Sequence, residues 1–545
     1  MLAAGRHGSE GKGKAIRSRA VSFPVELAAI LVAAVVLRAV ILAQDAVPFN
    51  SDEAVVALMA RHILQGEWPV FFYGQSYMGS LDATLIAVAF ALLGQSVLVI
   101  RLVQTILFLS IVATTYALGI RLLRDRRAAA AAALLMALPT VLVSTYTTAT
   151  LGGYGEILLL GNLILLCGHT VITDRPRDWR AWLGLGAAGG LGFWTMALVS
   201  VYLLPVGILI LARGFWATGS PRWSGRGLAL AGGAFLLFSA PWWWHNLTHG
   251  WSALGFLLTG TEASGIGIQE VNLITRLAGL GLLGVPALMG IRFPWSADYL
   301  VAPLSAGAVV IYLGGLACTL ERWQRHRDPG AMLMGSVGIA FGALFLFSRF
   351  GTDATGRYFL PLAPVFALAV GSLVSRLSAG HRWLAIVVLG YLVGFNLLGN
   401  GLALAQNPPG LTTQFDPSNR FDNAHDDELI RFLRDIGATC GYSSYFVAFR
   451  IAFLSDEEIV LSPQLPYKPD LSYNPADDRY PPYTATVESA DRVVFVTAIH
   501  PTLDRLLAER LRGIGIEFAE KVIGPYHVFH DLSRSVTPQE LGFGH

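Results

Sequence analysis

Long apolar stretches separated by short polar loops occupy the chain from about residue 24 to residue 403. A helix needs about 20 mostly apolar residues to cross the hydrocarbon core of a bilayer. Stretches of about this length lie near residues 24–43, 97–121, 128–146, 155–172, 226–244, 299–320, 331–348, 357–376 and 383–403. The stretch from Trp182 to Leu211 is too long for one span, and Gly189, Gly190 and Pro205 interrupt it, so it predicts two short helices. Together these segments predict about eleven membrane spans.

Arginines gather in alternate loops of this pattern. Lys- and Arg-rich loops face the cytoplasm in most membrane proteins. The basic loops are residues 121–127, 175–180, 213–226, 321–327 and 376–382. They all fall on one side only if residues 276–291, which are also apolar, do not cross. We therefore interpret residues 276–291 as a re-entrant or interfacial helix and place the carboxyl end outside.

The two ends of the chain differ from its middle. Residues 1–23 are basic, and the apolar stretch that follows them has no small-residue cleavage site, which predicts a cytoplasmic tail and a retained first span. Residues 404–545 are Pro-rich and charged, and alternate helical with strand-like patterns near 428–436, 458–462, 492–498, 503–514 and 526–532. This alternation predicts a small extracytoplasmic α/β domain. Its acids, including Asp426 and Asp477, are expected to be solvated or to cap helices.

The first external loop, residues 44–96, is expected to be structured. Residues 54–64 have helical periodicity with Arg61 and His62 on a polar face, and residues 81–93 are again apolar. Both segments predict helices that lie along the membrane surface without crossing it.

Composition supports an integral membrane protein. Hydrophobic residues make up 54% of the 545 residues and charged residues only 14%, whereas soluble domains are nearer one quarter charged. The net charge of +2 gives no reason to expect a nucleic-acid partner. Three scattered cysteines, Cys167, Cys318 and Cys440, are too few for a disulfide framework or a thiolate metal site.

Two adjacent carboxylates, Asp52 and Glu53, follow the first span. Ionised groups are costly near hydrocarbon, so this pair is a candidate site. The alternative interpretation is that Asp52 caps the helix that follows. Arg357 enters a late span at headgroup level, where a guanidinium can bind a phosphate. Its alternative role is an interface anchor beside Tyr358.

Other polar residues fall on the same outer side of the predicted topology. These candidate substrate-binding residues are Tyr73, Gln75, Tyr77, Asp82, Tyr154, Glu156, His245 and Asp353. Glu156 could instead stabilise a helix dipole, and His245 could belong to an aromatic belt with the preceding tryptophans.

Several features together resemble the GT-C superfamily of membrane glycosyltransferases. They are the acidic pair, the surface helices, the number of spans, and an Arg357–Tyr358 pair followed by Pro361 and Pro364. The resemblance covers residues 24–403 and is nearest to the protein-mannosyltransferase and aminoarabinose-transferase branch. It implies an all-α polytopic fold with about eleven transmembrane helices, to which the small α/β domain is added.

This resemblance also implies an activity. The enzyme would be an inverting glycosyltransferase that moves a sugar from a polyprenyl-phosphate donor to a glycan, lipid or protein acceptor outside the bacterial cytoplasmic membrane. Asp52 would deprotonate the acceptor hydroxyl, Glu53 would position the sugar or acceptor, and Arg357 with Tyr358 would stabilise the leaving lipid phosphate. No cofactor is required by the sequence, and a divalent metal stays possible.

The chain departs from the aminoarabinose-transferase pattern in one place. Those relatives carry Lys-Pro-Pro in the first loop, where this chain has Gly79, Ser80 and Leu81. The substitution predicts that Arg357 contributes more of the phosphate binding. Two other classes stay open, namely a transporter or flippase of envelope precursors and an envelope-assembly scaffold whose outer domain binds partners.

Overall fold

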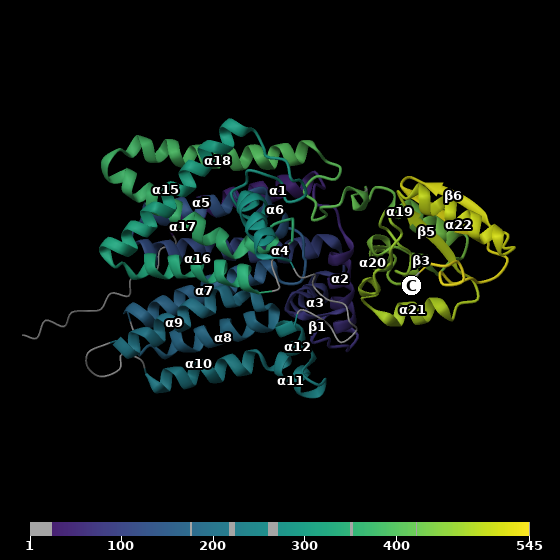
Figure 1. Cartoon of the computed structure of the whole chain (residues 1–545), viewed down its shortest axis with the longest axis horizontal. Coiled ribbons are helices and arrows are strands. Elements are labelled where there is room, and N and C mark those ends of the chain that lie inside the picture. Colours follow the sequence, from purple (N-terminus) through teal and green to yellow (C-terminus); the bar gives the residue numbers. More distant parts are fainter. Residues whose placement is uncertain are drawn as a thin grey trace, which may run out of the picture.

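The structure is a computed structural model that describes residues 24–543, except residues 175–176, 217–223, 260–270, 349–352 and 421. The basic tail predicted for residues 1–23 lies outside the described residues, as do parts of the loops at 175–180 and 213–226. A bundle of helices forms one part of the molecule, and a small α/β domain stands at one end of it (Figure 1). We call this domain, which follows α18 (Arg382–Ala405), the outer domain, after its predicted position.

Within the described residues, seven helices are long and apolar enough to cross a membrane. They are α1 (Val25–Ala43), α4 (Val97–Leu118) with η1 (Gly119–Leu123), α7 (Tyr154–His169) with η2 (Thr170–Asp174), α15 (Ala302–His326), α16 (Pro329–Phe347), η5 (Arg357–Leu362) with α17 (Ala363–Gly380), and α18 (Arg382–Ala405). An eighth would be the pair α10 (Gly225–Phe238) and α11 (Ala240–Thr248), bent by 61°. The polytopic helical fold is confirmed, and the number of eleven spans stays a prediction.

The other predicted spans are shorter helices. Residues 128–146 form α5 (Arg126–Ala137) and α6 (Val141–Tyr146), and the stretch 182–211 forms α8 (Trp179–Thr195), η3 (Ala197–Val199) and α9 (Ser200–Trp216). Residues 276–291 fall mostly in a short helical segment made of α13 (Leu273–Ala278), η4 (Gly279–Gly284) and α14 (Val285–Leu288).

The break between α8 and α9 lies at residues 196–199 and not at the glycine pair. Gly186 and Gly190 instead lie four residues apart on the face of α8 that meets α10. A Cβ atom on Gly190 would lie 2.4 Å from the carbonyl oxygen of Phe235, and one on Gly186 would lie 2.2 Å from that of Ala231. Small residues at this spacing let two membrane helices approach closely, so these glycines serve packing.

Irregular backbone between α5 and α7 is stabilised by polar side chains of the bundle. The amides of Asn396 and Asn400 donate to the carbonyl oxygens of Leu138 (2.8 Å) and Pro139 (2.9 Å). Arg38, buried in α1, donates to the carbonyl oxygen of Ser144 at 3.2 Å. Non-helical backbone is tolerated at membrane depth only where protein satisfies its hydrogen bonds.

The first external loop lies between the bundle and the outer domain (Figure 1). It folds into α2 (Ser51–Leu64), the hairpin β1 (Phe71–Phe72) and β2 (Gln75–Gly79), and α3 (Leu81–Leu93), with α12 (Ser252–Thr259) beside β2. Both predicted helices are present. The polar face expected at Arg61 and His62 is not exposed, because these residues are 5% and 3% exposed and contact the outer domain.

The outer domain is the predicted small α/β unit. Its five-stranded sheet has the order β4-β3-β5-β7-β6, with β3 parallel to β4 and β5, and β7 antiparallel to β5 and β6. The strands are β3 (Cys440–Ser443), β4 (Val460–Ser462), β5 (Val494–Ala498), β6 (Ala519–Ile523) and β7 (Tyr526–His530). The helical segments are η6 (Pro417–Asn419), α19 (Asp426–Asp435), α20 (Tyr445–Leu454), η7 (Pro475–Asp477), α21 (Pro481–Glu488) and α22 (Pro501–Gly513). The apolar helix α20 packs on α2 and so joins the two parts.

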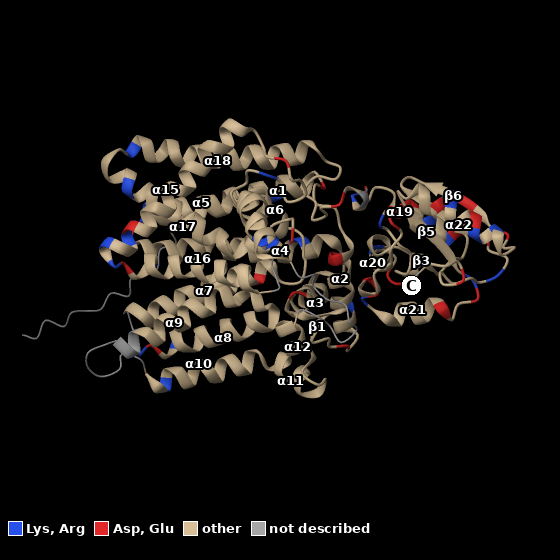
Figure 2. Ribbon diagram, in the orientation of Figure 1, with Lys and Arg blue, Asp and Glu red and all other residues tan. Residues whose placement is uncertain are grey.

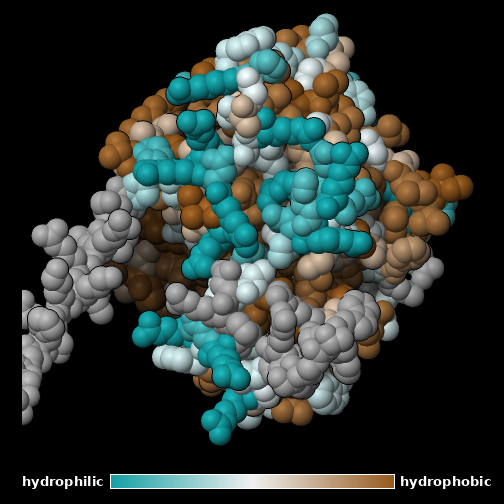
Figure 3. Space-filling view, turned by 90° about the vertical axis from the view of Figure 1, so that its left-hand side faces the viewer, coloured by the Kyte–Doolittle hydropathy of each residue, from teal (hydrophilic) through white to brown (hydrophobic). Residues whose placement is uncertain are grey.

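Charged side chains gather at the end of the bundle far from the outer domain and leave the middle of the helices nearly uncharged (Figure 2). Figure 3 shows hydrophilic side chains clustered on that end face. Arg322 donates there to the carbonyl oxygen of Leu122 (2.9 Å) and to Ser372 of α17 (3.0 Å), which joins two of the predicted cytoplasmic loops to α17. The described basic loops therefore share one end of the molecule.

Candidate functional site

Asp52 lies in the first turn of α2 but does not cap the helix. The cap is Asn50, whose side chain accepts from the Glu53 amide (3.1 Å) while the Glu53 carboxylate accepts from the Asn50 amide (3.4 Å). This reciprocal arrangement leaves the Asp52 carboxylate for another partner. The hydroxyl of Tyr445, at the start of α20, donates to Asp52 Oδ1 at 2.5 Å. The outer domain therefore contacts the candidate base directly.

A second outer-domain residue, Arg479, lies beside this pair. Its Cζ atom lies 5.5 Å from the centroid of the Tyr445 ring. With the Gln75 amide oriented for hydrogen bonding, its oxygen accepts from both terminal nitrogens of Arg479 (2.8 and 2.9 Å) and its nitrogen donates to the Tyr77 hydroxyl (3.2 Å). Gln75 thus connects Arg479 to the β1–β2 hairpin.

Tyr77 lies between the outer-domain residues and the late-span arginine. Burial raises the pKa of Tyr77, the charges of Arg357 and Arg479 lower it, and the Asp52 carboxylate raises it. Both arginines and Asp52 are therefore near one hydroxyl. The ring of Tyr77 stacks on Phe256 with centroids 4.9 Å apart. Tyr77 therefore bonds Gln75 of the hairpin and interacts electrostatically with both Asp52 and Arg357.

Arg357 begins η5, after a turn in which Gly356 has a φ of +81°. Its guanidinium pairs with Asp353 at 2.9 Å and lies 5.4 Å from the centroid of the Tyr358 ring. The Nε atom of Arg357 is buried without a hydrogen-bond partner among the described residues. The guanidinium therefore retains a donor for an anionic ligand.

An apolar cavity of about 320 Å³ opens at Tyr77 and Tyr358. Its walls come from η3, the start of α9, α12 and the outer end of α16. The lining residues other than these tyrosines are Met196, Ala197, Leu198, Ser200, Val201, Leu204, Leu257, Phe341, Leu344, Phe345 and Ser348. The cavity therefore reaches Tyr358, the tyrosine whose ring lies beside the Arg357 guanidinium.

Glu53 is placed differently from Asp52. It is 0% exposed, forms an ion pair with Arg101 of α4 and accepts from the Thr150 amide at 3.0 Å. Arg101 also donates to the carbonyl oxygens of Val47 (3.0 Å) and Thr148 (2.9 Å). The predicted catalytic role of Glu53 is not supported by this enclosed position, which instead fixes α2 to the loop before α7.

Asp82 and Glu156 form a second enclosed acidic pair, each 2% exposed. Asp82 accepts from the Gln104 amide (3.0 Å), the Gly152 amide (3.3 Å) and the Thr150 hydroxyl. Burial raises the pKa of Asp82. Asp82 thus stabilises the loop before α7, whereas both carboxylate oxygens of Glu156 are buried without a hydrogen-bond partner among the described residues. Neither acid lines the 320 Å³ cavity.

Tyr154 and His245 are both held by aromatic packing. Tyr154 is 5% exposed and packs edge-on against Tyr146, with ring centroids 5.6 Å apart. His245 of α11 packs against Phe71 (4.8 Å between centroids) and shares a hydrogen bond with Ser252 at 3.2 Å. His245 therefore fits the alternative role of an aromatic cluster.

Tyr73 belongs to a contact between α2 and the outer domain that we call the latch, made of Arg61, His62, Tyr73, Glu457 and Tyr483. His62 bonds Tyr73 through Nδ1 (2.8 Å) and Glu457 through Nε2 (2.9 Å). Arg61 (3.3 Å) and the Tyr483 hydroxyl (2.6 Å) also bond Glu457. Burial alone would raise the pKa of Glu457, but hydrogen bonds from His62 and Tyr483 and the nearby charges lower it to about 2.

Acid is expected to weaken the latch. Because the pKa of Glu457 falls from 4.5 to about 2 on docking, its contribution is complete above pH 4.5 and is lost as the pH falls toward 2. Hydrogen exchange in α2 should accelerate about tenfold across this window, after correction for the intrinsic rate. Glu457→Gln should remove that dependence, whereas Glu458→Gln, at a surface pair with Arg434, should retain it.

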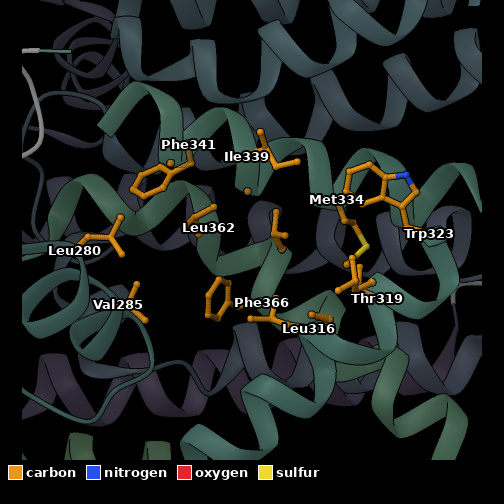
Figure 4. Close-up of a pocket in the computed structure, with 16 residues that line it drawn as sticks. Leu280, Val285, Leu316, Thr319, Trp323, Met334, Ile339, Phe341, Leu362 and Phe366 are labelled. Atoms are coloured by element: carbon orange, nitrogen blue, oxygen red, sulfur yellow. The ribbon is translucent and has the colours of Figure 1, made fainter. Parts of the chain in front are cut away.

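A second apolar cavity, of about 450 Å³, lies between α15, α16 and α17 (Figure 4). It extends from Trp323 at one end to Leu280 and Val285 at the other. Its lining includes no charged side chain. It is therefore a hydrophobic chamber separate from the acidic and basic residues of the site.

Metal binding stays open. Among residues 24–543, the gaps noted above excepted, no group of three His, Cys, Asp or Glu side chains could hold a metal ion.

Two outer-domain acids are less exposed than the sequence suggested. Asp477, expected to be solvated or capping, is 5% exposed, and burial raises its pKa to about 6 against the opposing charge of Arg479. Asp426 is likewise enclosed, paired with Arg450 at 2.8 Å.

The sequence reasoning missed Tyr445 and Arg479. Both lie nearly 400 residues after the loop they contact. A signal was present for Arg479, since it stands between two aspartates and the aromatic run from Tyr480 to Tyr483.

Comparisons with known proteins agree with this architecture. Residues 81–245, less than half of the chain, match the family described as dolichyl-phosphate-mannose-protein mannosyltransferase. No curated protein matches the sequence.

Solved structures are similar over nearly the whole chain. ArnT from Cupriavidus metallidurans bound to undecaprenyl phosphate has a TM-score of 0.61 and 15% identity, over 93% of this chain and 98% of ArnT. The apo form of that ArnT has a TM-score of 0.59 and 14% identity, over 92% and 97%. A mutant of arabinofuranosyltransferase AftD from mycobacteria has a TM-score of 0.50 and 14% identity, over 92% of this chain and 41% of AftD. The resemblance to GT-C glycosyltransferases and the ArnT-like fold are thus confirmed.

Proposed function

We propose that this GT-C-like chain is an inverting glycosyltransferase that moves a sugar from a polyprenyl-phosphate donor to an acceptor hydroxyl at the outer face of a bacterial cytoplasmic membrane. The observation that carries the proposal is the position of Tyr77. It lines the 320 Å³ apolar cavity and lies within the electrostatic influence of both Asp52 and Arg357. A lipid tail, a phosphate and a reacting hydroxyl each find a matching environment there.

The donor would place its isoprenoid tail in the apolar cavity and its phosphate beside Arg357. An isoprenoid chain gains about 25 cal/mol for each Å² of apolar surface removed from water, and Arg357 retains a donor for the phosphate oxygens. The ArnT structure with undecaprenyl phosphate supports this class of lipid. The acceptor can be a glycan, a lipid or a protein.

Transfer would take place in one displacement. The acceptor oxygen attacks the anomeric carbon while Asp52 takes its proton. The bond between the anomeric carbon and the phosphate oxygen breaks, and its electron pair leaves with the lipid phosphate, where Arg357 stabilises the growing charge. The configuration at the anomeric carbon inverts because attack and departure occur on opposite faces of the sugar.

A reconstitution assay tests the proposal. Proteoliposomes holding the full chain receive radiolabelled undecaprenyl-phosphate sugars together with an envelope lipid and glycan extract. Label in a new covalent product, with release of undecaprenyl phosphate, is the expected result. Label that crosses the vesicle membrane still attached to its original lipid would instead identify a flippase, the alternative class.

Arg357→Gln is expected to lower the transfer rate by about 10²–10³-fold, because the leaving phosphate loses its charged donor. Arg357→Lys should restore part of the rate, since an ammonium keeps the charge but not the two-pronged geometry. Single-turnover transfer with saturating donor measures both. Arg382→Gln, an exposed arginine at the far end of the bundle, is the control and should match the wild type. Unchanged turnover in Arg357→Gln would contradict this role.

A further inference from the structure

The docked outer domain places Arg479 against the β1–β2 hairpin. Its terminal nitrogens bond the Gln75 amide oxygen at 2.8 and 2.9 Å, and one of them also lies 3.4 Å from the carbonyl oxygen of Gly74. Gly74 has a φ of +68°, and a Cβ atom added to it would lie 3.0 Å from Cδ of Arg479. The hairpin turn is therefore shaped to receive this side chain.

Tyr445 is held as firmly as Arg479. Ser51, one residue before Asp52, donates to the backbone carbonyl of Tyr445 at 2.6 Å. The Tyr445 hydroxyl donates to Oδ1 of Asp52 at 2.5 Å, while the Arg479 guanidinium lies over the Tyr445 ring. The first turn of α2 and the first turn of α20 are thus joined on both sides of the carboxylate.

We propose that Tyr445 and Arg479 are positioning residues for Asp52, so that the reactive carboxylate is assembled only when the outer domain is docked on the first external loop. This inference rests on the proposed function, in which Asp52 is the base. The outer domain then becomes part of the reaction site, which differs from a separate partner-binding module.

Tyr445 and Arg479 make different contacts. Tyr445 occupies Oδ1, which leaves Oδ2 to take the acceptor proton. Arg479 lies over the Tyr445 ring and bonds the hairpin through Gln75, so it holds Tyr445 in place beside Asp52.

The test compares Arg479→Gln, Arg479→Lys and Tyr445→Phe with the wild type in the full chain. Two rates are recorded at one pH, the single-turnover transfer rate and the rate of carbodiimide modification of Asp52 measured by peptide mass spectrometry. The second rate reports on the Asp52 carboxyl without turnover. Arg512→Gln, at an exposed pair with Glu520, is the matched control.

In Arg479→Gln, the transfer rate should fall about tenfold or more, and Asp52 should be modified faster, because the contacts that hold Tyr445 against its carboxylate are lost. Arg479→Lys should return both rates toward the wild type, and Tyr445→Phe should lower the transfer rate with a smaller rise in modification. Arg512→Gln should change neither.

Two failures can be told apart. A wild-type chain that transfers no sugar overturns the proposed function. Wild-type modification rates in both Arg479→Gln and Tyr445→Phe overturn the positioning role, whatever the transfer assay gives. Only protein that elutes as a single species enters the comparison, and Tyr445→Phe, which removes a single hydroxyl, preserves the test if the glutamine variant does not fold.

Discussion

Asp52→Asn is expected to lower the transfer rate by about 10²–10⁴-fold, because a side-chain amide cannot take the acceptor proton. The substitution should leave the fold intact, since the Asn oxygen can still accept from the Tyr445 hydroxyl and the helix cap belongs to Asn50. Donor binding should stay close to the wild type, so that the maximal rate changes and the apparent donor affinity does not.

Single-turnover transfer with saturating donor measures this effect. Asp45→Asn is the matched control, because Asp45 is an exposed aspartate in the same loop with a φ of 45°, a conformation that Asn tolerates. Full activity in Asp52→Asn would remove the assigned mechanism. Equal losses in both variants would point to damage of the loop instead of loss of a base.

Removal of either partner of the enclosed Glu53–Arg101 pair is expected to destabilise the chain by about 3–5 kcal/mol, because the other charge stays buried without a partner. Glu53 is 0% and Arg101 4% exposed, and both also bond backbone groups of the loops before α2 and α7. Glu53→Ala and Arg101→Ala should therefore lower the temperature at which half of the protein stays monodisperse in detergent.

A double-variant cycle separates this role from catalysis. The Glu53→Ala, Arg101→Ala double variant should lose less than the sum of the single losses, by about 1–3 kcal/mol. The exposed pair Arg434–Glu458 is the control, and its removal should cost about 1 kcal/mol or less. If Glu53→Ala kept the heat resistance of the wild type but lost transfer activity, Glu53 would instead have the catalytic role that the sequence suggested.

These predictions assign different functions to the two adjacent carboxylates, Asp52 and Glu53. Consecutive helical positions point about 100° apart, so neighbours in the sequence face different surroundings. Glu53 faces α4 and the loop before α7, whereas Asp52 faces α20 of the outer domain. The first turn of α2 thus carries one acid, Glu53, that fixes the loop and another, Asp52, that faces the outer domain.

The outer domain is joined to the first loop over a broad contact. Phe453 of α20 packs against Phe49 and Phe90, with ring centroids 5.5 and 6.1 Å apart. The backbone amide of Leu411 donates to the carbonyl oxygen of Ala46 at 2.7 Å, and the Asn423 amide donates to that of Phe49 at 2.8 Å. These contacts, with the latch, make the position of Arg479 a consequence of docking.

The sequence by itself determined the membrane class, the helical segments and the small α/β domain. Apolar length and periodicity are local properties, and a bilayer accepts few structures other than helices. It also predicted Asp52 and Arg357 as candidate site residues, because charges at the ends of apolar stretches are conspicuous in an otherwise uncharged chain.

Only the tertiary structure decided which polar residues meet. Tyr445 is separated from Asp52 by 393 positions, and no local pattern encodes a contact at that distance. The glycines of α8 are a second example. In the sequence, Gly189 and Gly190 indicated a break between two helices, but in the structure Gly186 and Gly190 let α8 pack closely against α10. Burial and partner choice depend on the packing of whole elements, which enclosed Glu53 and Asp82 and brought Tyr445 and Arg479 of the outer domain to the first external loop.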